Sequence, residues 1–162
     1  MKKKKINWMK VAMLIAAFSM SSLFAHAQKI PTVQSYLAGL SATNQQALSS
    51  LMNDAQPTAA VTSNGISVFG SGSATVLDFK INDFSTINFS DPRLSNVQLI
   101  KIRLNSPTDF SNVLDLSSTA GLSQLSCIVL ISSVSATTAQ LNSVLLNVPT
   151  TVSTCYSISI PN

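Results

Sequence analysis

The 162-residue chain contains no glutamate, one histidine, one tryptophan and two cysteines. His26 and Trp8 both lie within the first 27 residues, which we interpret below as a removable targeting segment. Without histidine, the rest of the chain contains no Ser-His-Asp triad, no Cys-His pair and no imidazole zinc site. Two cysteines alone do not build a structural zinc site. We therefore expect no metal and no cofactor.

Aspartate supplies every acidic side chain. The acidic pairs that lie near each other in sequence are Asp78 with Asp83 and Asp109 with Asp115, and neither spacing is a recognised catalytic signature. Aspartate beside serine and asparagine more often accepts local backbone hydrogen bonds in turns and helix caps. We therefore expect capping roles for these residues and do not expect an enzyme.

The start of the chain is typical of a secretory signal peptide. A basic stretch is followed by the apolar run VAMLIAAF, which is too short to span a bilayer, and then by LFAHAQ. Small residues at Ala25 and Ala27 predict cleavage between Ala27 and Gln28. An uncleaved N-terminal anchor is the competing interpretation. The predicted location is the periplasm, the extracellular space or the cell surface, with no transmembrane segment once the signal is removed.

The basic character of the chain belongs to this segment. Residues 1–27 hold five of the ten cations and none of the acids, so their removal changes the net charge from +4 to −1. Nucleic-acid binding needs a clustered basic surface, which the remaining five cations do not predict. We expect no nucleic-acid partner.

Three zones follow within one predicted domain, 28–162. Residues 28–56 carry apolar side chains at helical spacing and predict two helices, with Thr43 or Asn44 as the cap of the second. Residues 57–74 are rich in Ser, Thr and Gly and predict a loop or a short strand around 66–69. Residues 75–162 form a repeat-type, β-rich zone.

Four runs in the third zone, at 76–82, 98–104, 126–132 and 155–160, alternate as strands do. One series of alternate residues is almost entirely apolar and the other is mixed, which predicts a sheet with one buried face. The apolar series comprises Leu77, Phe79, Ile81, Ile100, Ile102, Leu104, Ile128, Leu130, Tyr156, Ile158 and Ile160.

The spacing of these runs predicts parallel neighbours. Ile100 to Ile128 and Ile128 to Tyr156 are both 28 residues, and Phe79 to Ile102 is 23. Such intervals are typical of repeats that supply one strand and one return segment each. Two echoes support the repeat, DFSTI at 83–87 with DFSNV at 109–113 and LSNV at 94–97 with LSQL at 122–125, and 137–148 predicts a helical return.

The segments LSNVQL at 94–99 and LSQLSC at 122–127 resemble the L-x-x-L-x-L segment of leucine-rich repeats, although the asparagine ladder of that family is missing. The whole chain also resembles small exported proteins of Bacteroidota. These resemblances imply an architecture and do not indicate which function the protein has. The predicted fold is α/β, a short leucine-rich-repeat-like solenoid with a mostly parallel sheet and an N-terminal helical cap. The alternative is an irregular, mainly-β domain.

Cys127 and Cys155 fall at equivalent places on the mixed face, one repeat apart. An exported protein with two cysteines usually oxidises them, and we predict a disulfide. The alternative is two free thiols packed as small apolar groups beneath 133–154.

The mixed face also carries Lys80, Lys101 and Arg103, with Asp78 beside them. These three cations are the predicted binding residues, for an anionic envelope polysaccharide or a protein. The alternative is a solvated face partly covered by helices over Val129 and Ile131.

The predicted function is an exported, non-catalytic interaction or structural module. The alternatives are a small exported hydrolase using aspartates and an inhibitor or immunity-type protein that binds another exported protein.

Overall fold

A computed structural model describes residues 29–62 and 65–160. The predicted signal peptide, with its cleavage site between Ala27 and Gln28, lies outside these residues. Within the described ranges, no helix is both long enough and apolar enough to cross a membrane.

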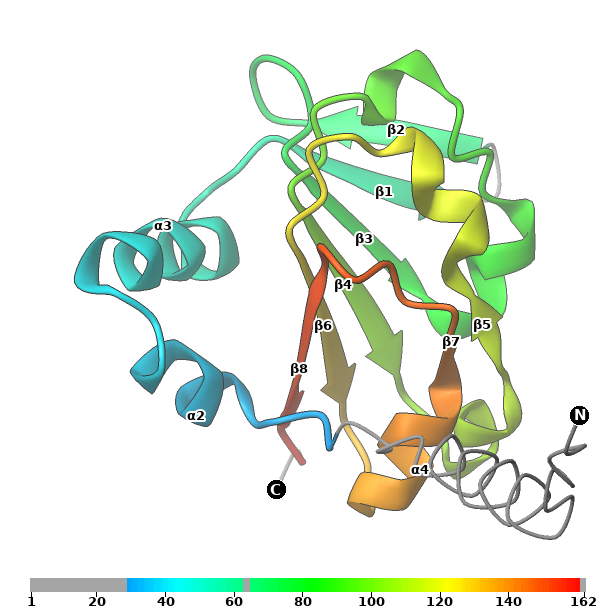
Figure 1. The fold of residues 1–162 in the computed structure, drawn as a ribbon. Coiled ribbons are helices and arrows are strands. Elements are labelled where there is room, and N and C mark those ends of the chain that lie inside the picture. Colours follow the sequence, from blue (N-terminus) through cyan, green and yellow to red (C-terminus); the bar gives the residue numbers. More distant parts are fainter. Residues whose placement is uncertain (1–28, 63–64, 161–162) are drawn as a thin grey trace, which may run out of the picture.

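A six-stranded sheet forms the centre of the molecule, in the order β2-β1-β3-β4-β6-β8 (Figure 1). The pair β1–β2 is antiparallel, and every other neighbouring pair is parallel. The protein is therefore mixed α/β with a mostly parallel sheet, as predicted. The strands are β1 Thr58–Thr62, β2 Gly65–Phe69, β3 Val76–Lys80, β4 Leu99–Leu104, β6 Cys127–Ser132 and β8 Ser153–Ile158.

The register matches two of the three predicted spacings. Phe79 lies opposite Ile102, and Ile100 lies opposite Ile128. The third is wrong by two residues, because Thr154 and not Tyr156 lies opposite Ile128. A shift of two residues keeps every side chain on its predicted face, since the period of a strand is two.

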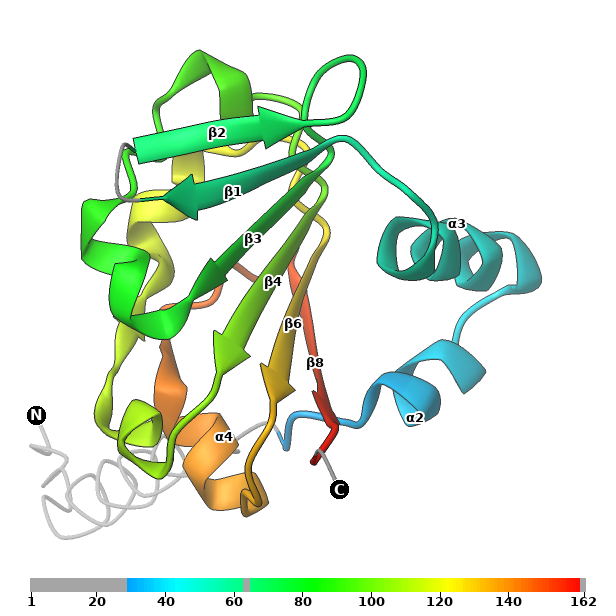
Figure 2. The same ribbon diagram turned by 180° about the vertical axis from the view of Figure 1, so that it is seen from behind.

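The members of the apolar series from Leu77 to Leu130 belong to one continuous core on the face that we call the return face. It contacts the segments that connect successive parallel strands, which all lie on that side of the sheet (Figures 1 and 2). These segments contain α4 Thr138–Val144, the short strands β5 Leu114–Asp115 and β7 Leu145–Leu146, and four 3-10 turns, η1 Ile81–Thr86, η2 Pro92–Leu94, η3 Pro107–Ser111 and η4 Leu116–Gly121.

The sequence echoes occupy equivalent places in this layer. The two DFS segments fall in η1 and η3, which are joined by side-chain hydrogen bonds from Asn82 to Asp109 and from Asn112 to Asn82. The two LS segments each form a turn just before a strand, at β4 and at β6. Their apolar residues are all buried: Leu94, Val97, Leu122 and Leu125.

The opposite side of the sheet, the helix face, is covered by α2 Val33–Ala38 and α3 Ala42–Asn53 (Figure 2). Ser41 caps α3 by accepting a hydrogen bond from the backbone of Asn44, so the predicted caps Thr43 and Asn44 lie inside the helix. Leu48 packs onto a patch of the sheet that contains both cysteines, and Val129 is fully buried beneath this layer. The helix face is therefore partly covered, as the alternative interpretation held.

The apolar series is confirmed in the centre of the sheet but not at its edge. Every member from Leu77 to Leu130 is buried, whereas Tyr156 is half-buried and Ile158 and Ile160 are exposed. The reason is that β8 is an edge strand of the sheet that residues 29–62 and 65–160 form. The strand β1 was not predicted, because its residues TAAVT are small and do not alternate clearly.

Candidate functional site

The three cations predicted to bind a ligand lie on adjacent strands, but they have different surroundings. Lys80 at the end of β3 is directly opposite Arg103 in β4, and Lys101 is directly opposite Asp78. All four side chains belong to the helix face, because alternate residues of a strand share a face. The structure therefore brings the predicted residues together on one sheet surface.

Lys101 has a structural role. Its Nζ donates a hydrogen bond to the backbone oxygen of Met52, near the end of α3, at 2.8 Å. An ammonium group at this position satisfies a carbonyl that the last turn of a helix leaves unpaired. Burial lowers the pKa of Lys101, with the neighbouring Arg103 acting in the same direction and Asp78 opposing it. Lys101 thus anchors the helical layer, and we withdraw it from the proposed ligand contacts.

Arg103 forms a two-pronged ion pair with Asp78. Its Nε and Nη2 donate to the two carboxylate oxygens of Asp78, both at 2.6 Å. This hydrogen bonding raises the pKa of Arg103 above its ordinary value. The pair fixes the guanidinium plane at the surface, where Arg103 is still about half exposed. Among residues 29–62 and 65–160, Lys80 forms no ion pair and its side chain is exposed.

A depression of about 670 Å³ brings Lys80, Arg103 and Asp78 together with residues of the β1–β2 hairpin. We call it the β1–β3 depression. It opens because β1 pairs with β3 only from Thr58 to Ala60 and then continues beside β2 alone. Figure 2 shows β1 and β3 fanning apart toward their ends. The remaining lining residues are Thr58, Ala60, Val61, Thr62, Gly65, Phe79, Asp83 and Thr86.

The lining of the depression is mixed, with apolar side chains beside polar ones, and its charges balance. Lys80 and Arg103 provide two positive charges, and Asp78 and Asp83 provide two negative ones. Three threonine hydroxyls, of Thr58, Thr62 and Thr86, donate to backbone oxygens of the protein and keep lone pairs that can accept from a ligand. Because Asp78 is already paired, the group left to attract a ligand charge is the Lys80 ammonium. The depression suits a ligand with many hydroxyl groups and an occasional negative charge.

The second acidic pair predicted from the sequence is structural. Asp109 is 5% exposed and caps η3, accepting hydrogen bonds from the backbone of Asn105 and Ser106 as well as from Asn82. Asp115 accepts from the backbone of Ser117 and from Asn147, and these bonds lower its pKa. Both carboxylates therefore fill the capping roles expected of them.

Cys127 and Cys155 lie on neighbouring strands beneath the helical layer, but the structure holds them as free thiols. The predicted equivalence of the two positions is wrong, because Ser153 lies opposite Cys127 and Cys155 lies opposite Val129. The two sulfur atoms are 4.0 Å apart. Their mutual hydrogen bond and burial raise the pKa of Cys127.

The disulfide remains a prediction. The offset of two residues between Cys127 and Cys155 along the strands adds strain to such a bond. Residues that are diagonal across two strands have Cα atoms about 7–8 Å apart, at or beyond the limit for an unstrained bond. If the cysteines are nevertheless oxidised, closing this loop stabilises the protein by about 3.5 kcal/mol before strain is subtracted. We expect alkylation of unreduced, denatured protein to add no mass. Two labelled thiols, measured by mass spectrometry, would show that the cysteines stay reduced.

No family model matches the chain, and no curated protein or solved structure matches it either. Residues of 29–62 and 65–160 form no group of three or more potential metal ligands.

Proposed function

We propose that the protein is an exported, non-catalytic binding module that recognises an acidic polysaccharide of the cell envelope at the β1–β3 depression. The observation that carries the proposal is the meeting of Lys80 and Arg103 in one depression that also holds three threonines. Lys80 contributes the ion pair to a ligand carboxylate, and the Arg103 guanidinium, held flat by Asp78, contributes further donors.

The architecture supports this proposal. Four parallel strands follow one another in chain order, and their return segments all lie on one side of the sheet. We interpret this arrangement as a short, leucine-rich-repeat-like solenoid whose N-terminal helices cover part of the opposite face. Repeat proteins commonly bind partners along the surface formed by successive strands. Lys80 and Arg103 lie on the part of the helix face that α3 does not cover.

We expect Lys80→Ala and Arg103→Ala each to weaken binding of a uronic-acid oligosaccharide about tenfold, because each removes a charge-assisted hydrogen bond. Isothermal titration calorimetry with the acidic oligosaccharide, and with a neutral glucan of the same length, measures the effect. Lys29→Ala is the matched control, since it removes the same charge from an exposed lysine outside the depression. Equal affinity of all three variants would show that the depression is not the binding site.

A further inference from the structure

The two edges of the sheet are protected to different degrees. At the β2 edge, Arg93 donates to the backbone oxygen of Ile66 at 2.5 Å, and Asp91 holds the guanidinium through an ion pair of 2.6 Å. A charged side chain placed on an edge strand blocks pairing with another chain. The β2 edge is thus closed to a further strand near its middle.

The β8 edge is only partly covered. The N–H groups of Ser153 and Ser159 donate to the backbone oxygens of Ser126 and Ser132, on the side of β6. The peptide groups of Thr154, Tyr156 and Ile158 therefore face the open edge. Tyr156 donates to the backbone oxygen of Pro31 at 3.0 Å, and Thr32 forms a parallel bridge with Tyr156. Within the described ranges, no residue accepts a hydrogen bond from the N–H of Thr154.

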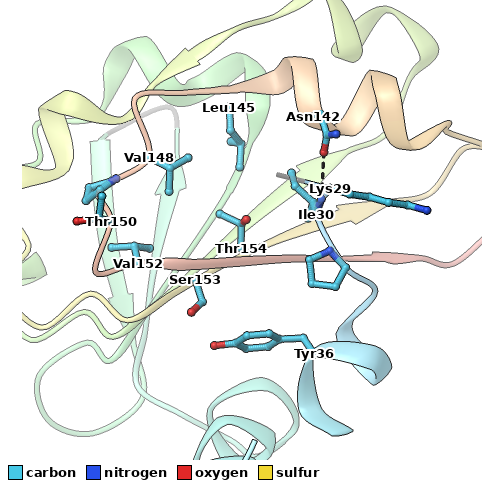
Figure 3. A pocket seen from close by; sticks show the side chains of 12 residues that line it. Lys29, Ile30, Tyr36, Asn142, Leu145, Val148, Thr150, Val152, Ser153 and Thr154 are labelled. Atoms are coloured by element: carbon cyan, nitrogen blue, oxygen red, sulfur yellow. Dashed lines mark hydrogen bonds between the residues drawn. The ribbon is translucent and has the colours of Figure 1, made fainter. Parts of the chain in front are cut away.

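A groove of about 660 Å³ runs beside this open part of the edge. Figure 3 shows Val148 and Leu145 on one side of β8 and the Tyr36 ring on the other, with Thr154 between them. The volume is within the range of about 300–1,000 Å³ that ligand sites occupy. Lys29 is the one charged residue among those lining the groove, and its side chain points away from it in Figure 3.

The shape and charge of the groove indicate which kind of ligand fits it. The edge is recessed between two walls, so the β8 strand of a second copy, which carries the same walls, does not fit against it. A free-standing extended segment does fit. The protein already accepts one there, since Pro31 and Thr32 pair with Tyr156 at the next position along the same edge. A groove without a facing charge matches an uncharged segment.

We propose that this groove binds an extended, uncharged peptide segment of another protein, which adds to the sheet as a strand beside β8. The main chain of the peptide hydrogen-bonds to the open peptide group of Thr154. Its alternate side chains contact Leu145 and Val148 on one wall and Tyr36 on the other, because successive side chains of a strand point to opposite faces. This site is separate from the β1–β3 depression, with which it shares no lining residue.

A pair of proline variants tests the proposal. Thr154→Pro removes the outward N–H at the β8 edge, and Val68→Pro removes an outward N–H at the β2 edge, where Val68 faces Ala59 in a pair without ladder bonds. The probe is a pool of fluorescent eight-residue peptides built only from Val, Ile, Leu, Thr, Ser, Asn and Gly. Fluorescence polarisation with the tightest peptide of the pool measures affinity for the full chain.

We expect at least a tenfold loss of affinity for Thr154→Pro and less than a twofold change for Val68→Pro. Val148→Asp keeps the backbone intact and is expected to abolish binding by placing a carboxylate in the groove. Thermal unfolding of each variant verifies that it folds. Three outcomes would overturn the proposal. The first is that no peptide binds saturably, and the second is that both proline variants lose the same affinity. The third is that the protein dimerises through β8 and does not bind a peptide.

Discussion

Leu130→Ala is expected to lower the free energy of unfolding by about 2–5 kcal/mol, the range for a leucine that leaves a cavity in a packed core. Leu130 has no exposed surface, and it lies in β6 between Ile102 of β4 and Tyr156 of β8. Domains of this size are stabilised by only about 5–15 kcal/mol in total. Urea unfolding followed by circular dichroism measures the loss.

Val113→Ala is the control for this substitution. Val113 is 58% exposed, and truncating it is expected to change stability by less than about 0.5 kcal/mol. Ile158→Ala tests the edge of the same series, where the side chain is 38% exposed, and its effect should fall between the two. If Leu130→Ala were as mild as Val113→Ala, the side-by-side arrangement of β4, β6 and β8 would be wrong.

The alternation of apolar residues predicted the centre of the sheet because each central strand has a neighbour on both sides. In β4 and β6 the pattern correctly places Ile102 and Leu130 in the core of the return face, but it does not show that α2 and α3 also bury Val129 on the opposite face. The same pattern continues into β8, yet Ile158 is exposed. A period of two reports which face a side chain is on, and it does not report whether another strand covers it.

The register of β8 shows a second limit of the same signal. Shifting β8 by two residues moves no side chain to the other face, so the apolar pattern fits either register equally well. The connection before β8 decides between them. This connection contains Pro149 and also Asn147, which has a φ of 54° in the left-handed region. At its end, Ser153 lies opposite Cys127. Turn geometry of this kind has no periodic signature in the sequence.

The candidate site was predictable to the extent that it depends on the register of β3 and β4. The predicted spacing of 23 residues between Phe79 and Ile102 is confirmed, and the same register places Lys80 opposite Arg103. The role of Lys101 was not predictable, because it depends on where the end of α3 lies over the sheet. The β1–β3 depression was missed since β1 itself was missed.

The helical layer has few buried residues of its own. Leu48 is the only buried residue of α2 and α3 among those described, and it packs over Cys127 and Cys155. Segments with few buried apolar contacts open locally at a lower free energy than the whole domain. The two thiols, 2% and 0% exposed, report such opening because they become accessible only when the layer moves away.

Leu48→Arg is therefore expected to expose both cysteines of the reduced, folded protein to alkylation. Losing a buried leucine costs about 2–5 kcal/mol, and each 1.4 kcal/mol changes an opening equilibrium about tenfold. The labelling rate, followed by mass spectrometry, should rise at least about thirtyfold. Gln46→Arg, at an exposed position of the same helix, introduces the same charge and should leave the rate unchanged. Equal labelling of both variants and the original protein would mean that α2 and α3 do not protect the helix face, and that the anchoring role of Lys101 is wrong.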